Sequence, residues 1–304
     1  MLKKSTLLLA FAISVFALEI PKNHIVSTSW LDKNIDDKNL VVIDTRSTKA
    51  YKKSHIKGAV NYPKKVWFRG KLGNIPKLQN SMQQVQDMLQ NAGVTEKSLI
   101  LFYSAGTKNK DFADAVSGIW NLWLYGMQNS VLLNGGFAKW VSEKKSVTAK
   151  LPKIAKSDIE LDSFDKSIVA SLYDINEAMY DDNIQITDAR VSKFYTGIDK
   201  KKSLVRHGRI PTAKLTPVIR YTKKTESYFE LISAKEAKKT LYNSGYGVEL
   251  DKPLITYCNT GHKARGLWFV AKFLVGMKNV KVFDGSMVEY SRTNLPIETG
   301  EPME

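Results

Sequence analysis

Cys258 is the only cysteine in the sequence, and the residues around it favour nucleophilic chemistry. It ends an apolar run, beginning at Leu254, that is typical of a buried strand. A short segment containing Gly261 follows, and a helical pattern begins near Ala264. A thiol between a strand end and a helix start lies among backbone N–H groups at the positive end of the helix dipole, which favours the thiolate. We therefore predict a reactive nucleophile; the alternative is a buried, inert thiol.

Residues 258–263 form a loop that is suited to an anion. Its N–H groups can converge on the sulfur, and a thiolate held in this way needs no separate general base. After attack on a sulfur electrophile, the same N–H groups would stabilise the terminal sulfur of a persulfide. His262 and Lys263 add positive charge nearby. The loop therefore predicts a small anionic sulfur donor, such as thiosulfate, or an anionic acceptor.

The overall charge also favours anionic partners. The chain of 304 residues has 46 Lys and Arg against 30 Asp and Glu, a net charge of +16. Its lysines are scattered rather than clustered with aromatic residues, so we expect no nucleic-acid partner. Four histidines without ligand spacing and one cysteine predict no metal site, and the absence of a glycine-rich phosphate motif predicts no nucleotide cofactor. We expect a monomer.

Residues 1–17 read as a secretory signal peptide. Lys3 and Lys4 precede an apolar stretch over residues 7–16, and small residues occupy the usual cleavage spacing before Leu18. We therefore expect a periplasmic or secreted protein, with an uncleaved N-terminal anchor as the alternative. The apolar stretch is short for a membrane span, and no other stretch is long enough. A lone cysteine in an oxidising compartment is reactive or pairs with another molecule.

The order of elements occurs twice along the chain. An apolar strand over residues 40–46 matches a strand over 183–190, and each ends in Asp-x-Arg. The strand at 98–103 matches the one at 252–257, so Ser104 takes the position of Cys258 in the first copy. Alternating strands and helices predict an α/β fold with a mainly parallel sheet covered by helices on both faces, formed twice.

Loss of hydrophobic periodicity marks the boundary between the copies. We predict a first domain over residues 18–145, a linker over 146–165 and a second domain over 166–304. Ligands of such sheets bind beyond the carboxyl ends of the strands, where Asp188, Arg190 and Cys258 would share one rim. Residues 67–76 are expected to be a loop. The expected helices begin near residues 27, 81, 112, 171 or 174, 233 and 264, the fifth with a capping box and an end at Gly245.

The ordered motifs resemble tandem-domain rhodaneses, a family of sulfurtransferases built from two similar α/β domains. The matching pieces cover residues 25–292: Asp44 and Arg46, residues 55–59, residues 133–136 with Trp140, Asp188 and Arg190, residues 208–211, Cys258 with Gly261, and residues 284–290. The resemblance implies a catalytically silent first domain and sulfur transfer from thiosulfate or a related donor to cyanide or a thiol. It makes Cys258 the sulfur-accepting nucleophile. The substrate-binding residues that it implies are Asn259, Thr260, Gly261, His262, Lys263, Ala264 and Arg190.

Several alternatives remain open. Phe194 stands where thiosulfate-using relatives tend to carry a basic residue, and the loop after Cys258 matches neither the thiosulfate type nor the 3-mercaptopyruvate type. The alternative functions are a 3-mercaptopyruvate sulfurtransferase and a periplasmic polysulfide or persulfide carrier, which would need the same loop. A phosphatase or arsenate reductase needs arginine at the sixth position after the cysteine, where this chain has Ala264. Arg190 is either near the substrate or part of a structural salt bridge, and His262 is either a substrate contact or a solvated residue.

Overall fold

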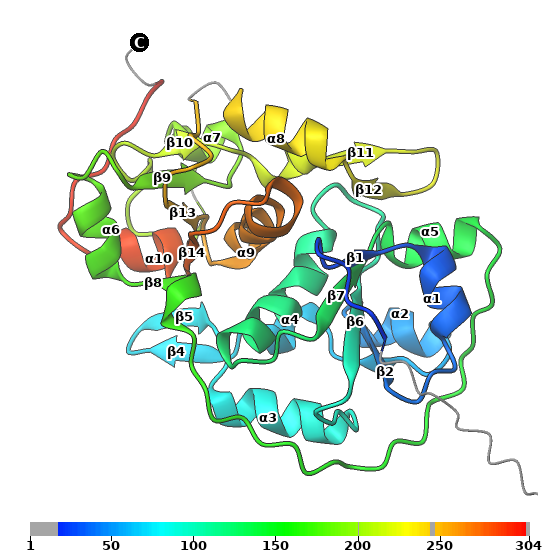
Figure 1. Ribbon diagram of the computed structural model, residues 1–304. Helices are drawn as coiled ribbons and strands as arrows, with labels where there is room; N and C mark the ends of the chain where they lie inside the picture. Colours follow the sequence, from blue (N-terminus) through cyan, green and yellow to red (C-terminus); the bar gives the residue numbers. More distant parts are fainter. Residues whose placement is uncertain (1–17, 200, 244–246, 302–304) are drawn as a thin grey trace, which may run out of the picture.

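The computed structural model describes residues 18–199, 201–243 and 247–301, so the predicted signal peptide and the predicted helix end at Gly245 lie outside the described residues. The described residues contain two five-stranded sheets, paired in parallel throughout (Figure 1). The first sheet has the order β1 (Ile25–Val26), β7 (Ser130–Leu133), β6 (Leu99–Tyr103), β2 (Leu40–Asp44), β3 (Val60–Asn61). The second has the order β8 (Val169–Ala170), β14 (Val280–Phe283), β13 (Leu254–Tyr257), β9 (Gln185–Asp188), β10 (Lys214–Leu215). The two orders correspond strand for strand, which confirms the predicted repeat.

Helices flank both sheets. Those of the first half are α1 (Thr28–Asn34), α2 (Thr48–Lys53), α3 (Met82–Asn91), α4 (Phe112–Leu124) and α5 (Gly136–Ser142), with a 3-10 turn η1 (Lys64–Trp67). Those of the second half are α6 (Leu172–Ala178), α7 (Ser192–Tyr195), α8 (Ala234–Tyr242), α9 (His262–Phe269) and α10 (Ser286–Tyr290). Shorter helical turns are η2 (Lys166–Ile168), η3 (Val218–Tyr221) and the π-helical η4 (Val270–Val275), which continues α9.

The central strand β6 shows why its sequence is continuously apolar. Leu99 and Leu101 belong to the buried cluster on one face of the sheet, whereas Ile100 and Phe102 belong to the cluster on the other face. Since successive side chains of a strand point to opposite faces, both faces need apolar residues when helices cover both. The predicted fold class, with helices on both faces of each parallel sheet, is confirmed.

Serine caps define where three of the helices begin. Ser81, Ser171 and Ser233 each accept a hydrogen bond from the third helical residue and form a capping box with it. The box at Ser233 was expected from the sequence. Helix α6 begins after Ser171 rather than after Asp174, because Asp174 is the acidic partner of that box.

The two halves share one hydrophobic core. Helices α4 and α9 pack against each other, and a Cβ atom at Gly266 would lie only 2.9 Å from that of Ala113. Trp120 of α4 and Trp268 of α9 belong to the same buried cluster. A hydrophobic interface of this kind holds two domains in a fixed relation, so residues from both can form one site.

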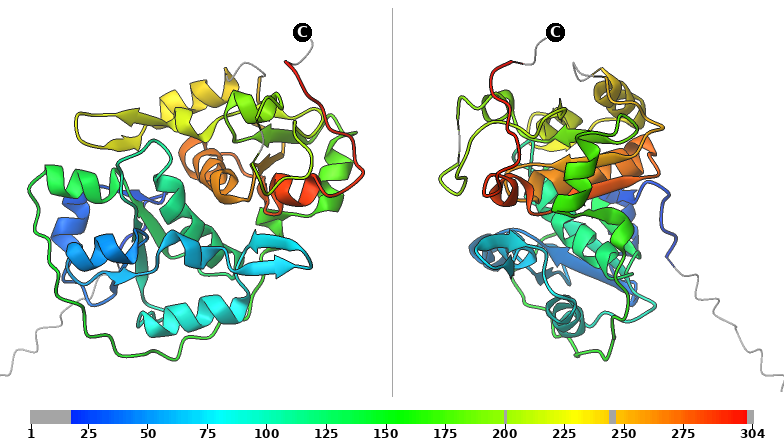
Figure 2. Two further views of the ribbon diagram at one scale, coloured as in Figure 1. Left: turned by 180° about the vertical axis from the view of Figure 1, so that it is seen from behind. Right: turned by 90° about the vertical axis from the view of Figure 1, so that its left-hand side faces the viewer.

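The connection between the halves follows the surface of the first one. It runs as an extended chain around α3 before it enters the second half (Figures 1 and 2). Ser157 donates its N–H to the carbonyl of Gln90, and Ile159 and Leu161 are buried. The segment predicted as a linker is therefore anchored, and the exact domain boundaries stay predictions.

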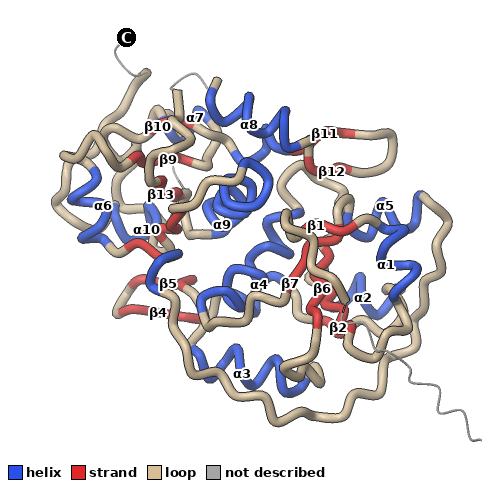
Figure 3. The backbone as a smooth tube through the Cα atoms, in the orientation of Figure 1, coloured by secondary structure: helices blue, strands red, loops and turns tan. Residues whose placement is uncertain are grey.

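The prediction of a loop over residues 67–76 was wrong. The structure has a hairpin there, formed by β4 (Gly70–Leu72) and β5 (Ile75–Leu78), and a matching hairpin, β11 (Thr222–Lys224) and β12 (Phe229–Leu231), in the second half (Figure 3). The register of β4 and β5 shifts between Gly70 and Lys71, and the ribbon is mostly exposed. Such a ribbon lacks the apolar alternation by which strands are recognised.

A search of the described residues for a helix that is long and apolar enough to cross a membrane gives none.

Candidate active site

Cys258 follows β13 directly, and its side chain is buried, with 2% of the residue exposed. It forms no disulfide. Helix α9 begins at His262 rather than near Ala264, because Gly261 adopts a positive φ of 76° that turns the chain into the helix. The loop is thus shorter than predicted, and the N–H groups of the first helical turn lie close to the thiol.

Ser286 is a functional residue that the sequence analysis missed. Its Oγ accepts the N–H groups of Cys258 and Gly261, both at 3.1 Å, and donates to the carbonyl of Phe283 at 2.8 Å. Ser286 is buried and has a positive φ of 48°, unusual for a residue other than glycine. The available signal was the match between the segment after β14 and the Gly-Gly segment after β7. The hydroxyl fixes the curvature of the cysteine loop.

The remaining N–H groups of the loop are available to an anion. Those of Asn259, Thr260, Lys263 and Ala264 find no acceptor among the residues that the structure describes. Unpaired N–H groups at a helix start attract negative charge. The predicted cradle is therefore narrower than residues 259–264, because the N–H of Gly261 is already bonded to Ser286.

Gly261 has a separate, steric role. A Cβ atom at this position would lie 2.5 Å from Oδ1 of Asp284, which follows β14. Together with the positive φ, this contact excludes larger residues. Gly261 thus shapes the loop by lacking a side chain.

Arg190 lies at the end of β9 and is held by a fork of hydrogen bonds. Its Nε donates to both carboxylate oxygens of Asp188 at 2.9 Å, and its Nη2 donates to Asp188 and to the carbonyl of Gly208. Its Nη1 reaches Oδ1 of Asn259 at 3.3 Å. Burial alone would lower the pKa of Arg190, but the negative groups around it, Asp188 first, raise that pKa above its ordinary value.

The same fork occurs in the first half, where Arg46 binds Asp44 and the carbonyl of Ser54. A pattern present in both halves serves the scaffold, which supports the salt-bridge interpretation of Arg190. The bond to Asn259 joins the scaffold to the cysteine loop. Arg190 and Cys258 therefore share one rim, as expected, but the arginine positions the loop rather than facing it freely.

Lys263 lies in the first turn of α9 and is half-buried. Burial lowers the pKa of its ammonium group; the nearby Cys258 opposes this, while Lys110 and Lys201 add to it. No carboxylate within the described ranges forms an ion pair with Lys263. Its positive charge remains available to an anion at the sulfur.

His262 faces the first half of the molecule. Its Nε2 lies 2.7 Å from Oδ1 of Asp114 on α4, and Lys64 also contacts that oxygen. Burial lowers the pKa of His262 to about 4, so the ring is neutral at pH 7 and Nε2–H donates the bond. Burial would raise the pKa of Asp114, but its bonds to His262 and Lys64 lower it. His262 is thus not a solvated loop residue; it anchors α9 to α4.

Arg265, one residue beyond the phosphatase position, is fully buried. Its Nε and Nη2 donate to Asp284 at 3.1 and 2.7 Å, and its Nη1 donates to the carbonyl of Trp67 in the first half. Asp284 also accepts the N–H of Gln79 at 2.6 Å. This guanidinium joins the two halves and does not clamp an oxyanion at Cys258.

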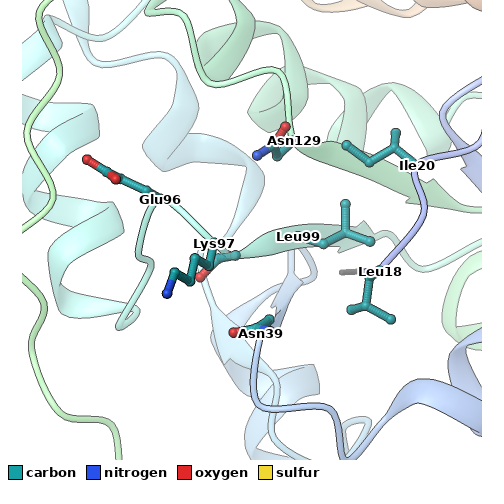
Figure 4. Close-up of a pocket in the computed structure, with 8 residues that line it drawn as sticks. Leu18, Ile20, Asn39, Glu96, Lys97, Leu99 and Asn129 are labelled. Atoms are coloured by element: carbon teal, nitrogen blue, oxygen red, sulfur yellow. The ribbon is translucent and has the colours of Figure 1, made fainter. Parts of the chain in front are cut away.

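Two hollows of similar volume differ in the residues that line them. One, of about 350 Å³, opens beside the cysteine loop, and its lining residues are Lys64, Lys65, Phe68, Lys77, Lys201, Thr260 and His262. The other, of about 430 Å³, is drawn in Figure 4, and its labelled residues are Leu18, Ile20, Asn39, Glu96, Lys97, Leu99 and Asn129. The second hollow lies at the amino end of β6, away from the carboxyl ends where the loops emerge, and no cysteine lines it. The first hollow is the one next to the segment that follows Cys258.

The described residues contain no group of three or more His, Cys, Asp or Glu side chains that could hold a metal ion.

The chain is similar to curated proteins over nearly all of its length. It is 30% identical over 285 residues to the "Putative thiosulfate sulfurtransferase" of Mycolicibacterium smegmatis, covering 91% of this chain and 98% of that one. It is 27% identical to a sulfur carrier protein of Thermus thermophilus, covering 91% and 97%. It is 25% identical to the 3-mercaptopyruvate sulfurtransferase of Escherichia coli, covering 90% and 97%.

Solved structures show the same fold. The 3-mercaptopyruvate sulfotransferase SseA of Escherichia coli superposes with a TM-score of 0.72 at 24% identity, covering 86% of this chain and 98% of that one. The anaerobic ergothioneine biosynthesis enzyme of Chlorobium limicola superposes with a TM-score of 0.75 at 19% identity, covering 92% and 71%. The sequence profile of the rhodanese-like domain matches residues 27–143 and again residues 171–293. This chain therefore belongs to the rhodanese-like domain family and contains the domain twice.

Proposed function

We propose that this protein is a sulfurtransferase that moves sulfane sulfur from thiosulfate or a related donor to cyanide or a thiol through a persulfide at Cys258. One observation carries the proposal. The only thiol of the chain, Cys258, lies buried at a strand end in the second domain copy. Unpaired N–H groups and the unpaired ammonium of Lys263 lie beside it. Its relatives named as sulfurtransferases support this chemistry.

The first half-reaction loads the cysteine. The thiolate of Cys258 attacks the outer sulfur of thiosulfate, a sulfur–sulfur bond forms at Sγ, and the sulfur–sulfur bond of thiosulfate breaks. The bonding electrons leave with sulfite, and the persulfide keeps one negative charge. The N–H groups of Asn259, Thr260, Lys263 and Ala264 and the ammonium of Lys263 are the groups placed to stabilise that charge.

The second half-reaction empties the cysteine. A thiolate or cyanide attacks the terminal sulfur, the bond between that sulfur and Sγ breaks, and its electrons return to Sγ. No proton transfer is required if the acceptor is already an anion. Arg190 and His262 act in both steps as positioning residues. Arg190 holds the loop through Asn259, and His262 holds it through Asp114 of α4.

Intact-protein mass spectrometry tests the proposal directly. After incubation with thiosulfate, 3-mercaptopyruvate or polysulfide, the protein should gain the mass of one sulfur atom at Cys258. The added mass should disappear on exposure to cyanide or a thiol. If no donor adds sulfur, the sulfur-transfer function is wrong; comparison of the three donors also identifies the preferred one.

A persulfide carrier is the second candidate, favoured by the similarity to the sulfur carrier protein of Thermus thermophilus. A carrier and an enzyme share the loading step but differ in turnover. Multiple turnovers of thiosulfate with cyanide indicate an enzyme, whereas a single loading event followed by slow release indicates a carrier.

We also propose that the protein works outside the cytoplasm, for which the pattern of residues 1–17 is the support, and that it is a monomer. Cell fractionation with detection of the processed N-terminus tests export, and light scattering of the purified protein tests the monomer. The first domain copy is proposed to be catalytically silent because Ser104 replaces the thiol.

A further inference from the structure

The hollow of about 350 Å³ beside the cysteine loop is strongly basic. Lys65, Lys77 and Lys201 line it, all three are exposed, and none forms an ion pair in the described part of the chain. Lys64 shares Asp114 with His262, whose ring is neutral at pH 7. The lining therefore carries an excess of unpaired positive charge, drawn from both domain copies.

This basic pocket is continuous with the cysteine loop. Thr260 and His262 line the pocket and belong to the segment that follows Cys258. The N–H of Thr260 is one of those without an acceptor. Lys201 also lies close enough to Lys263 to lower the pKa of that residue. A molecule in the pocket would thus contact the segment that follows the sulfur-bearing residue.

Size and charge restrict the occupant. Pockets of a few hundred Å³ take small organic molecules, and thiosulfate, with five heavy atoms, would leave most of this one empty. The loop N–H groups and Lys263 already suffice for such a small donor. The lysines of the pocket are therefore left for the other substrate.

The conformation of Lys77 adds a second observation. Lys77 belongs to β5 of the hairpin and has a positive φ of 69°. A lysine in this conformation is strained, and such residues persist where the surroundings or the function require them. Here the hairpin carries an unpaired ammonium group into the pocket lining.

On the basis of the proposed sulfur transfer, we propose that this basic pocket binds the sulfur acceptor, and that the acceptor is a low-molecular-weight thiol with two or more negative charges several bonds from its sulfur. Its phosphate or carboxylate groups lie among Lys65, Lys77 and Lys201 while its thiolate reaches the persulfide. The thiolate forms a bond to the terminal sulfur, the bond to Sγ of Cys258 breaks, and the electron pair returns to Sγ. The product is the persulfide of the acceptor.

A matched pair of thiols tests the proposal. Pantetheine and 4′-phosphopantetheine differ by one phosphate monoester, which carries about −1.5 to −2 charges at pH 7. Protein loaded with thiosulfate is mixed with each thiol, and the loss of the sulfur mass is followed with time. We expect the phosphorylated thiol to react at least about tenfold faster, since three exposed charge pairs contribute up to about 1 kcal/mol each.

Two triple variants provide the comparison. Lys65→Gln, Lys77→Gln and Lys201→Gln together should abolish the preference for the phosphorylated thiol without slowing the loading by thiosulfate. Lys49→Gln, Lys52→Gln and Lys238→Gln remove the same charge from exposed sites outside the pocket lining and should keep the preference. The preference of the wild type should also decrease with salt.

Three results would overturn the acceptor assignment: equal rates for the two thiols with the wild type, a preference that survives the first triple variant, or a loss of preference in both variants. If the first triple variant slows loading and not unloading, the pocket serves the donor instead. Calorimetric binding of 4′-phosphopantetheine and pantetheine to unloaded protein separates the two proposals. Selective binding without loading contradicts the sulfur transfer, whereas loading without selective binding contradicts only the role of the pocket.

Discussion

The loops at Ser104 and Cys258 occupy equivalent places in the two halves, yet only one is open. The backbone N–H groups of Phe137 and Met287 bind the carbonyls of Ser104 and Cys258, respectively, in the same way. Around Ser104, however, the remaining hollow is only about 10 Å³. A hollow of about 350 Å³ opens beside the segment after Cys258, with Thr260 and His262 in its lining. The two halves share the scaffold, but they share neither the nucleophile nor the access to it.

The hairpin of the opposite half explains the difference in access. At the first site, Phe229 of β12 donates to the carbonyl of Gly106, and Leu231 donates to Asn134 at 2.9 Å. At the second site, Gln79 makes the equivalent bond to Asp284, but the β4–β5 hairpin donates no backbone N–H to the cysteine loop. The first site is therefore closed by the opposite half of the molecule and also lacks a thiol.

The strongest test of the comparison exchanges the nucleophile. Cys258→Ser should reduce sulfur transfer by more than about a thousandfold, because it removes the atom that forms the covalent intermediate. Adding Ser104→Cys to this variant should not restore sulfur loading, since the hairpin closes that site. Mass spectrometry after thiosulfate treatment measures both. A persulfide at position 104 would show that the cysteine alone makes a site.

The next test concerns the contact between the halves. Asp284→Asn gives the second site the residue that the first site has at Asn134, but it leaves the buried Arg265 without its counter-charge. Breaking one partner of a buried ion pair costs about 3–5 kcal/mol. In urea unfolding, the free energy of unfolding of Asp284→Asn should fall by this amount. The reverse exchange, Asn134→Asp, should not raise the free energy of unfolding, because the first site has no such arginine to pair with. An unchanged free energy of unfolding would contradict a clamping role for this pair.

A smaller effect is expected at Ser286, which corresponds to Gly136 in the first half. Ser286→Gly suits the positive φ but removes the hydroxyl that binds Cys258 and Gly261. Losing these two hydrogen bonds costs the curved loop about 1–2 kcal/mol. We therefore expect the loading rate to fall by about tenfold or more. The melting temperature should change little by comparison, because glycine relieves the backbone strain. If this variant is loaded at the rate of the wild type, the Ser286 hydroxyl does not support the reaction and serves packing only.

The last effect concerns stability rather than loading: it is the dependence on pH that His262 gives to the second half. Its pKa falls from 6.5 in the unfolded chain to about 4 in the fold, so the unfolded chain binds more protons between these values. Stability from this group is complete above about pH 6.5 and decreases as the pH falls toward 4, by up to about 3 kcal/mol. The ring faces Asp114, Lys64 and Arg265, and the lowered pKa of Asp114 places its own titration at still lower pH.

His262→Gln is the control, since its amide can still donate to Asp114 but does not titrate. Melting temperatures measured from pH 7 to pH 4 should fall less steeply for this variant than for the wild type. Identical slopes would mean that His262 is not the group responsible.

Much of the candidate site could be predicted because it is local in the chain. Cys258, Gly261 and Lys263 are close in sequence, and a strand, a glycine and a helix pattern suffice to place them together. Arg190 could be placed on the same rim because parallel strands end at one edge. The β4–β5 hairpin was missed because an exposed ribbon has no apolar alternation.

Residues whose role depends on the other half could not be predicted. From the sequence, His262 could be a solvated loop residue. Only the structure shows that its Nε2 lies 2.7 Å from Oδ1 of Asp114 on α4. Ser286 becomes important only because β14 lies next to β13 and brings its hydroxyl to the N–H of Cys258. Lys65, Lys77 and Lys201 are three scattered lysines until the halves meet.

The sequence by itself determined the nucleophile, the repeated α/β fold and the family resemblance, because each depends on residue type and on spacing within a few turns or strands. The tertiary structure alone decided which loop is open, which N–H groups remain free and which charges gather at the thiol. The physical reason is that these properties come from packing between α4 and α9 and from hairpins that reach across the interface, over separations that a local pattern does not encode.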